Sequence, residues 1–470
     1  MGNGVASDDP IVQFNPGSAA RFLNGHMVWD VVDTTKLRSD STSVNIARSG
    51  GNTYYIKQNL TLKKFTVSSD ASVVTTFAPG KNLSYDQCLF KLPNGQIAIT
   101  GSRYNDYASM LGGKDSIFLH YGTLPLVTYV LGADNRIEGN GSITGPIVLL
   151  APSAVLNCNL DGTLEGNLML NGGTVNLEGG LILADDAVIA TGGSMNLGAY
   201  PLDFPAKDTL WTSTILWGGT HANLNLNGKT SLAGQWVFTG DCTINGKGNM
   251  LDLSSGGKMV INDGVEVTLR DVRLSGIAAD SIVMSGDGSK LVLDDMTWVQ
   301  SENVCFDIGS IRFIGDVDFV GSYTFAYDSA STSTIAAKSN WHVADGMRLA
   351  IGRKTPNGAS PLYFEDNTST LNLDNCNFHV NQFGLPLSRG RVLCSRDVAV
   401  DIASTSTLNG IHLGDGTLAG DMVFEFFPGC SVNFTNGHVV YDITQPDSVK
   451  SRSTTAKLIR DHDSVFYIKK

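Results

Sequence analysis

Short apolar segments alternate with glycine-rich or acidic corners along the chain, and their spacing predicts a regular winding of β-strands. Five of them begin six or seven residues apart: Leu168-Met-Leu170, Val175-Asn-Leu177, Leu181-Ile-Leu183, Val188-Ile-Ala190 and Met195-Asn-Leu197. Because successive side chains of a strand point to opposite sides, the two end residues of each segment face the same way. Corners such as Gly172-Gly173 and Asp185-Asp186 tolerate the positive φ of a sharp bend. Three such strands make a coil of about 20 residues, a usual length for stacked repeats.

A second pattern describes the bend between two strands of one coil. In Val267-Thr-Leu269-Arg-Asp271-Val272-Arg-Leu274, two inward residues precede a polar corner and two more follow it. The same order recurs from Leu291 to Trp298 and from Leu371 to Phe378, and with one extra residue from Ile311 to Phe319. The starts at 267, 291 and 311 are about one coil apart, and small insertions at the corners account for their uneven spacing.

Part of this pattern resembles a known superfamily. The stretch Thr243-Ile-Asn-Gly246-Lys-Gly248-Asn-Met250-Leu-Asp-Leu253, followed by the 267 to 274 segment, is similar to pectin-lyase-like right-handed β-helix proteins. Arg136-Ile-Glu-Gly139-Asn-Gly141-Ser-Ile143 repeats its first half. The resemblance covers roughly residues 131 to 445 and implies an all-β fold, a right-handed parallel β-helix or β-solenoid. Because that superfamily contains polysaccharide lyases and hydrolases, phage tailspikes and bacterial adhesins, it leaves the activity open.

The two ends of the chain lack this rhythm. Residues 1–130 contain β-like runs such as Leu60-Thr-Leu-Lys but little regular winding, and residues 446–470 are the most basic and least periodic part. We therefore predict an N-terminal β-rich cap or head over 1–130, the parallel β-helix over 131–445, and a C-terminal cap or tail over 446–470. Caps of this kind cover the unpaired strand edges that an open solenoid end would expose.

Composition agrees with a β protein and disfavours several partners. Glycine makes up 52 of 470 residues, and charged residues make up 17%, against roughly 7% and 25% in average proteins. The net charge of −12 comes without a basic stripe, so nucleic acid is not an expected partner. No apolar run approaches the roughly 18 residues of a membrane span. The seven cysteines are far apart, without the spacing of a metal site, and are predicted to be small buried apolar residues.

Candidate chemistry is sparse, and no catalytic, cofactor-binding or metal-binding residue is predicted. Asp294-Asp295 could stack with Asp271 and Asp316 into an acidic ladder suited to a cation or to glycoside hydrolysis. Aspartate is also a good corner residue, and Asn375 takes the same place in the 371 to 378 segment. We therefore interpret these aspartates as structural.

Two tryptophans and one loop are candidate sugar contacts. Trp211 and Trp217 lie in the less regular segment 208–217, where an exposed indole could stack on a carbohydrate. Arg353-Lys354 could hold the carboxylate of a uronic acid. Trp236 and Trp298 alternate with apolar neighbours and are predicted to lie in the core.

Together these features predict a non-enzymatic structural or adhesive β-solenoid, surface-associated or assembling into a fibre or oligomer. The expected partners are further copies of the chain, end to end or as a trimer, or a cell-surface or polysaccharide ligand. The alternative is a polysaccharide lyase or glycoside hydrolase, including a tailspike-like one, that acts on an acidic polysaccharide. No cofactor is expected. An extracellular location, or one on a cell or virion surface, follows from analogy alone, since no signal peptide is visible in this chain.

Overall fold

The chain is all-β and folds as a parallel β-solenoid, as predicted. Its computed structural model describes side chains for residues 151–352 and 361–379 except 367, and for 137, 142, 143, 146–149, 390 and 392; elsewhere it describes strand backbones alone. In these parts there is no α-helix, and accordingly no helix with the length and apolar character of a membrane span. The chain divides into two compact units, residues 1–228 and 229–470, and each is described by itself.

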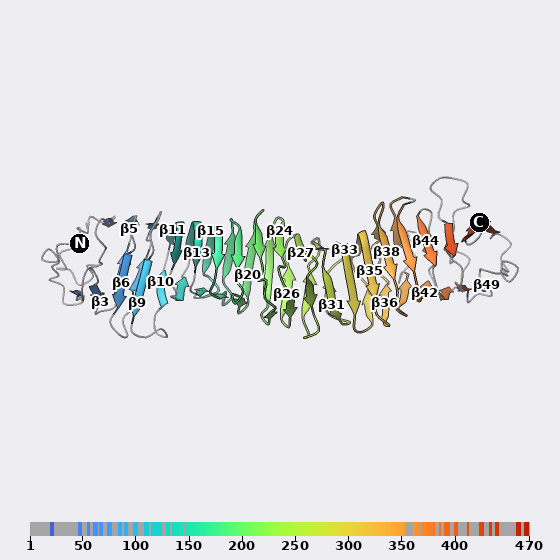
Figure 1. Cartoon of the computed structure of the whole chain (residues 1–470), viewed down its shortest axis with the longest axis horizontal. Helices are drawn as coiled ribbons and strands as arrows, with labels where there is room; N and C mark the ends of the chain where they lie inside the picture. The colour runs from blue at the N-terminus through green and yellow to red at the C-terminus, as the bar shows by residue number, and fades with distance from the viewer. Residues whose placement is uncertain are drawn as a thin grey trace. The chain divides into compact units, whose positions relative to one another are not determined.

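In the first unit, strands of successive coils pair in parallel (Figure 1). The strands whose side chains are described throughout are β14 (Ile147–Leu149), β15 (Val155–Leu164), β16 (Leu168–Met169), β17 (Thr174–Leu177), β18 (Leu181–Leu183), β19 (Ile189–Ala190), β20 (Gly193–Leu197), β21 (Pro201–Asp203), β22 (Thr209–Trp211), β23 (Ile215–Gly219) and β24 (Ala222–Asn225). Thr174 pairs with Val155 in the preceding coil and with Ser194 in the following one. The predicted coil length of about 20 residues is therefore confirmed.

One predicted segment of this unit has the opposite register. The sequence pattern predicts that Val188 and Ala190 face inward, but Ala187 and Ile189 are the buried residues, with 0% and 2% exposure. A turn ends at Ala187, whose N–H donates to the carbonyl of Ala184 at 2.8 Å, and this turn directs Ala187 into the core. Because side chains alternate along a strand, a change of one residue reverses the whole segment.

The second unit has three faces, each made of one strand from every coil. Its strands up to Val380 are β25 (Thr230–Leu232), β26 (Gln235–Phe238), β27 (Cys242–Asn245), β28 (Met250–Asp252), β29 (Lys258–Ile261), β30 (Glu266–Arg270), β31 (Arg273–Ile277), β32 (Ile282–Met284), β33 (Lys290–Gln300), β34 (Val304–Phe306), β35 (Ser310–Val320), β36 (Thr324–Tyr327), β37 (Ser333–Ile335), β38 (Asn340–Val343), β39 (Arg348–Ile351), β40 (Leu362–Phe364), β41 (Thr370–Leu373) and β42 (Asn377–Val380). The pairs that these strands form with one another in successive coils are parallel.

We name the faces by their strands. Face I consists of β27, β30, the first half of β33, the first half of β35, β37 and β40. Face II consists of β25, β28, β31, the second halves of β33 and β35, β38 and β41. Face III consists of the third strand of each coil, which is β26, β29, β32, β34, β36, β39 or β42. Figure 1 shows these strands in sequence from β26 to β42.

The predicted polar corners are confirmed by the backbone. Asp271, Asp295 and Asn375 have φ values of 49°, 48° and 46°, and Gly315 has 64° in the segment with the extra residue. This left-handed conformation is one that aspartate, asparagine and glycine adopt most readily. The flanking residues predicted to point inward are buried; they are Val267, Leu269, Val272, Leu274, Leu291, Leu293, Met296, Trp298, Ile311, Phe313, Val317, Phe319, Leu371, Leu373, Cys376 and Phe378.

The prediction that Asn375 takes the same place in the coil as Asp271 is wrong. Asp271 and Asp295 turn the chain from face I to face II, whereas Asn375 follows β41 on face II and turns the chain to face III. The local sequence is alike because each corner needs one left-handed residue between two inward pairs. Local sequence alone therefore does not distinguish one corner of the coil from another.

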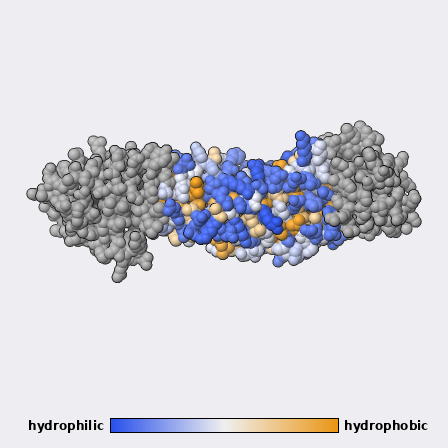
Figure 2. Space-filling model, in the orientation of Figure 1, coloured by the Kyte–Doolittle hydropathy of each residue, from blue (hydrophilic) through white to orange (hydrophobic). Residues whose placement is uncertain are grey.

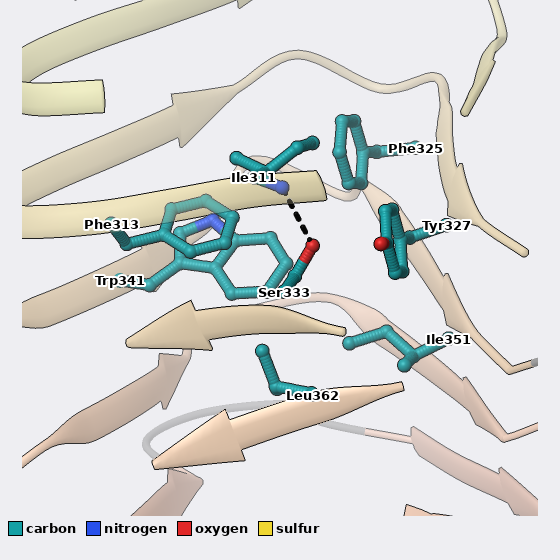
Figure 3. A pocket seen from close by; sticks show the side chains of 8 residues that line it. All are labelled: Ile311, Phe313, Phe325, Tyr327, Ser333, Trp341, Ile351 and Leu362. Carbon is teal, nitrogen blue, oxygen red and sulfur yellow. Dashed lines mark hydrogen bonds between the residues drawn. The ribbon is translucent and has the colours of Figure 1, made fainter. Parts of the chain in front are cut away.

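The core of the second unit is rich in stacked aromatic rings. Phe313 and Trp341 lie face to face, with ring centroids 4.0 Å apart and an interplanar angle of 16°. Figure 3 shows this pair beside Ser333, whose hydroxyl accepts the Ile311 N–H at 2.9 Å. The space between the eight side chains drawn there is too small to hold a water molecule. This small gap is a feature of core packing and offers no ligand site.

Antiparallel pairs occur near both ends of the chain. β1 (Ala19–Phe22) pairs antiparallel with β5 (Phe65–Ser68), and the hairpin of β50 (Lys457–Asp461) and β51 (Val465–Lys469) pairs antiparallel with β47 (Val423–Phe426). Antiparallel strands placed on a parallel stack change the edge that it presents. The boundaries at residues 130 and 445 stay a prediction.

Candidate functional site

The corner aspartates bind the backbone of the neighbouring coil. Asp295 Oδ1 accepts the N–H of Asp316 at 2.8 Å, Asp263 Oδ1 accepts the N–H of Gly288 at 2.8 Å, and Asp241 Oδ1 accepts the N–H of Glu266 at 2.9 Å. In each case the aspartate and its donor lie in successive coils. These carboxylates therefore satisfy backbone donors that the corners leave without a strand partner.

Asp271, Asp295 and Asp316 lie at the corner between face I and face II in three successive coils, but Asp294 and Asp295 are held in structural contacts. Asp294 is 8% exposed and lies 2.7 Å from the guanidinium of Arg270 in the preceding coil, measured from Oδ2 to Nε. Among residues whose side chains are described, no three histidine, cysteine or acidic side chains are grouped so as to hold a metal ion. The structural interpretation of these aspartates agrees with the contacts that they make.

Buried serines close a recurrent four-residue turn that sequence reasoning missed. In the turns that end at Ser281, Ser289 and Ser369, the serine Oγ accepts the N–H three residues earlier, at 2.9, 3.1 and 3.3 Å. The serine N–H donates back to the carbonyl of that same residue. The three serines are at most 3% exposed. In the sequence, such a turn can be recognised by a serine that lies between a polar corner and the first residue of an apolar strand.

Inter-coil ion pairs add to these contacts. Asp252 lies 3.0 Å from Lys229 Nζ and accepts the N–H of Ser254. Burial tends to raise the pKa of Asp252, but the hydrogen bonds from Ser254 and Lys229, together with the charge of Lys229, outweigh it and hold that pKa below its ordinary value. The carboxylate is therefore stabilised as an anion that joins two coils.

The prediction that Trp211 and Trp217 are exposed is wrong. Their exposures are 1% and 0%. Trp211 stacks on Phe204 with ring centroids 4.7 Å apart, and its Nε1 donates to Thr209 at 3.1 Å. Segment 208–217 forms β22, a corner and the start of β23, and alternation turns the two indoles inward. Neither indole face is accessible for stacking on a sugar.

On face II, the outward residues in the middle of the strands form a polar row. The row consists of Arg273, Thr297, Asp318, His342 and Asn372, one from each successive coil. His342 Nδ1 lies 3.0 Å from Asp318 Oδ1. In the neutral imidazole this contact places the proton on Nδ1 and leaves Nε2 as an acceptor. Of the outward groups that the structure describes, this pair is the arrangement best suited to proton transfer.

The corresponding row on face III is apolar or small over six coils. It consists of Val237, Val260, Val283, Cys305, Ala326 and Ala350, and His379 in β42 follows Ala350 in the next coil. Figure 2 shows that hydrophilic and hydrophobic residues are interspersed over the visible part of the described surface. The three faces of the second unit thus differ in chemistry although they share one backbone architecture.

The sequence of this chain matches no protein-family model, and no curated protein shows significant similarity to it. The assignment to a solenoid therefore rests on strand pairing and burial. Arg353-Lys354, the other predicted sugar contact, lies outside the described residues.

Cys305 differs from the other described cysteines, and the prediction that it is buried is wrong. Cys158, Cys242 and Cys376 are buried, whereas Cys305 is exposed and forms no disulfide. Its side chain points outward because Val304 and Phe306 on either side of it face the core. Cys88, Cys394 and Cys430 lie outside the residues with described side chains.

At about pH 8, iodoacetamide should modify Cys305 in the native protein and leave Cys158 and Cys242 intact. The thiolate is the reactive form. Burial raises the pKa of Cys158 to about 11 and raises that of Cys242 as well, so both thiols stay protonated and shielded. Peptide mass spectrometry after labelling, with and without denaturant, measures the difference. Native labelling of Cys158 as fast as that of Cys305 would contradict the placement.

Proposed function

We propose that the chain is a non-enzymatic structural or adhesive β-solenoid of the pectin-lyase-like kind, associated with a surface or assembling into a fibre or oligomer. The observation that carries this proposal is how the polar corner side chains are used. Asp241, Asp263, Asp295, Ser289 and Ser369 all hold backbone groups of their own or a neighbouring coil. Side chains that serve the stacking of coils in this way support a role as a scaffold.

The energetics of these contacts favour a stiff stack. A hydrogen bond contributes about 1 kcal/mol to stability, and a buried donor left without a partner costs about 1–3 kcal/mol. Most of the corner contacts join residues one coil apart, so each resists separation of neighbouring coils. In a repeat protein such nearest-neighbour terms add along the stack. A scaffold that spaces or presents binding surfaces needs this stiffness, whereas a mobile catalytic loop does not.

The same proposal includes an extracellular, cell-surface or virion-surface location. It also includes the partner, which is a further copy of the chain or a polysaccharide-bearing surface. The net charge of −12 supports solubility at high local concentration. A polar row such as that of face II, with hydroxyl, amide, imidazole and carboxylate groups at a spacing of about 4.8 Å, suits contact with a hydroxyl-rich surface.

A second candidate function is a polysaccharide lyase or glycoside hydrolase that acts on an acidic polysaccharide. The pair of His342 and Asp318, 3.0 Å apart on an outward face, favours it. A histidine oriented by a carboxylate can act as a general base. In this alternative His342 Nε2 takes a proton from the sugar or from a water molecule, and Arg273 in the same row attracts the substrate carboxylate.

Turnover on acidic polysaccharides distinguishes the two functions. The purified chain is incubated with polygalacturonate, alginate and hyaluronate, and the release of new reducing ends and of ultraviolet-absorbing unsaturated products is followed. We expect no release above that of a heat-denatured sample, together with co-sedimentation of the chain with at least one insoluble polysaccharide or with itself. Release that disappears in His342→Ala and persists in Thr297→Ala would establish the enzymatic alternative.

A further inference from the structure

One of the three faces of the second unit has an apolar or small middle row over six coils, which ends at His379 in the following coil. The row lies on face III: Val237, Val260 and Val283 are paired in register, as are Cys305, Ala326 and Ala350. None of the six is buried, and Val283 is 37% exposed. A strand with one solvated face normally alternates apolar inward residues with polar outward ones. Here the outward middle positions are apolar or small as well.

The other two faces are more polar at the equivalent positions. The outward middle row of face II includes Arg273, Asp318 and His342. That of face I consists of Thr243, Thr268, Val292, Arg312, Thr334 and Tyr363. The difference is therefore specific to face III and does not follow from the general composition of outward positions. The row is carried by two sheets, one with β26, β29 and β32 and the other with β34, β36 and β39. An exposed apolar strip bordered by polar residues marks an interaction surface.

We propose that face III is the surface on which a second copy of this chain packs, with the two coil stacks parallel. This inference deepens the proposed function, since it rests on the assembling role and names the face that assembles. Two sheets that pack face to face interdigitate their side chains at a separation of about 10 Å. The small residues Ala326 and Ala350 allow such close approach.

The regular spacing of the row favours a copy of the same chain over another partner. Coils repeat at about 4.8 Å, so only a partner with the same repeat keeps its side chains in step along all six coils. A helix rises about 5.4 Å per turn, so its side chains lose register with the row within a few turns. A second copy matches the repeat by construction.

The charges at the margins of the row select the parallel orientation. Before the middle position, the margin carries Arg348 and the paired Lys258 and Asp280; after it, the margin carries Asp307 and Asp328. Arg348 makes no ion pair with any residue that the structure describes. A twofold axis parallel to the coil stack places the basic margin of one copy opposite the acidic margin of the other. An axis perpendicular to the stack and along the strands would place like margins together.

The size of the row predicts a reversible dimer. Six coils span about 29 Å, and four strand residues span about 13 Å. This strip is about half of the roughly 800 Å² that each partner contributes to a standard interface. We therefore expect a monomer–dimer equilibrium that depends on concentration, and the parallel axis would place Cys305 of one copy opposite Cys305 of the other.

Sedimentation equilibrium of the full chain over a range of concentrations tests this proposal. We expect a monomer–dimer equilibrium that Val260→Lys weakens at least tenfold, because the lysine would be buried in the apolar strip. Thr297→Lys, at an outward position of face II, is the matched control and should leave the dissociation constant unchanged. Arg348→Glu should weaken the dimer several-fold, with a smaller effect at high salt. Circular dichroism and the melting temperature establish that each variant is folded.

Cross-linking tests the orientation. A short bis-maleimide should link two copies through Cys305 in the wild type and not in Cys305→Ser. A chain that stays monomeric up to its solubility limit overturns the proposal, as does a dimer that Val260→Lys leaves intact or one that gives no link through Cys305. A chain that stays monomeric and cleaves no polysaccharide would contradict this inference but not the proposed scaffold role. A chain that cleaves polysaccharide and dimerises through face III would contradict the scaffold role but not this inference.

Discussion

Replacing Trp298 with alanine should lower the stability of the second unit by about 3–5 kcal/mol, the range for removal of a large aromatic side chain from a core. Trp298 is fully buried, and its ring stacks on Phe319 with centroids 5.0 Å apart. Phe306 and Phe325 meet it edge to face. Each such aromatic pair contributes about 0.5–1.5 kcal/mol beyond the area it buries, so the substitution removes three pairs and leaves a cavity between coils.

A polar consequence adds to this loss. Trp298 Nε1 donates to Gln300 Oε1 at 3.3 Å, and the amide of Gln300 donates to the carbonyls of Glu302 and Thr324, each at 2.6 Å. Without the indole, the Gln300 oxygen lies buried with one donor fewer, which is a further penalty of about 1–3 kcal/mol if no water replaces it. The amide still joins Gln300 in β33 to Thr324 in β36, which belongs to the next coil.

Urea denaturation combined with native-state hydrogen exchange measures the effect. Repeat arrays can unfold in parts, so exchange in β35 and β36 gives the local response that a global midpoint can hide. Thr297→Ala, one residue away and directed outward, should change stability by no more than about 0.5 kcal/mol. Equal shifts in the two variants would show that the aromatic cluster does not hold these coils together.

The bends of the coil could be predicted from sequence because their requirements are local. A left-handed residue between two inward pairs is visible as Asp271, Asp295 or Asn375 flanked by alternating apolar residues, and all three have positive φ. Burial of Trp298 could be predicted for the same reason, since Met296 and Thr297 before it alternate between inward apolar and outward polar. Where the pattern is clear on both sides of a corner, local chemistry decides the structure.

The pattern fails where apolar residues follow one another without alternation. In Thr209-Leu-Trp211 and Ile215-Leu-Trp217, either alternate set could face inward, and the structure exposes Leu210 and Leu216 while burying both tryptophans. A continuous apolar run does not fix which side of a strand faces the core. The larger indoles fill the interior, and the prediction of a sugar contact there had no other support.

The roles of the corner side chains could not be read from sequence because their partners lie one coil away. Asp295 meets the N–H of Asp316, and Asp263 meets that of Gly288. Which residues meet depends on the length of each coil, and Ser310 pairs with Lys290 whereas Thr370 pairs with Asn340. Insertions at the corners change this distance from coil to coil. The pairing of His342 with Asp318 was hidden in the same way.

Replacing Gly257 with alanine should destabilise the second unit by about 3 kcal/mol, the upper end of the range for overpacking. A Cβ at Gly257 would lie 2.2 Å from the carbonyl oxygen and 2.7 Å from the carbonyl carbon of Leu232 in the preceding coil. Both atoms belong to the backbone, so no rotation of a side chain relieves the clash. The coils have to separate there, which also strains the hydrogen bond from the N–H of Lys258 to the carbonyl of Gly234, now 3.0 Å long.

Gly256, the residue before it in the same turn, provides the matched control. Its φ is 87°, and a Cβ there would meet no atom within 4 Å, so Gly256→Ala incurs only the left-handed backbone penalty of about 1–2 kcal/mol. The two variants add the same methyl group one residue apart and separate steric contact between coils from backbone strain. Chemical denaturation, with hydrogen exchange in β26 and β29, should rank Gly257→Ala as the less stable. The reverse order would mean that the coils are not in contact at this corner, and that the stacking distance on which the scaffold role depends is relaxed at little cost.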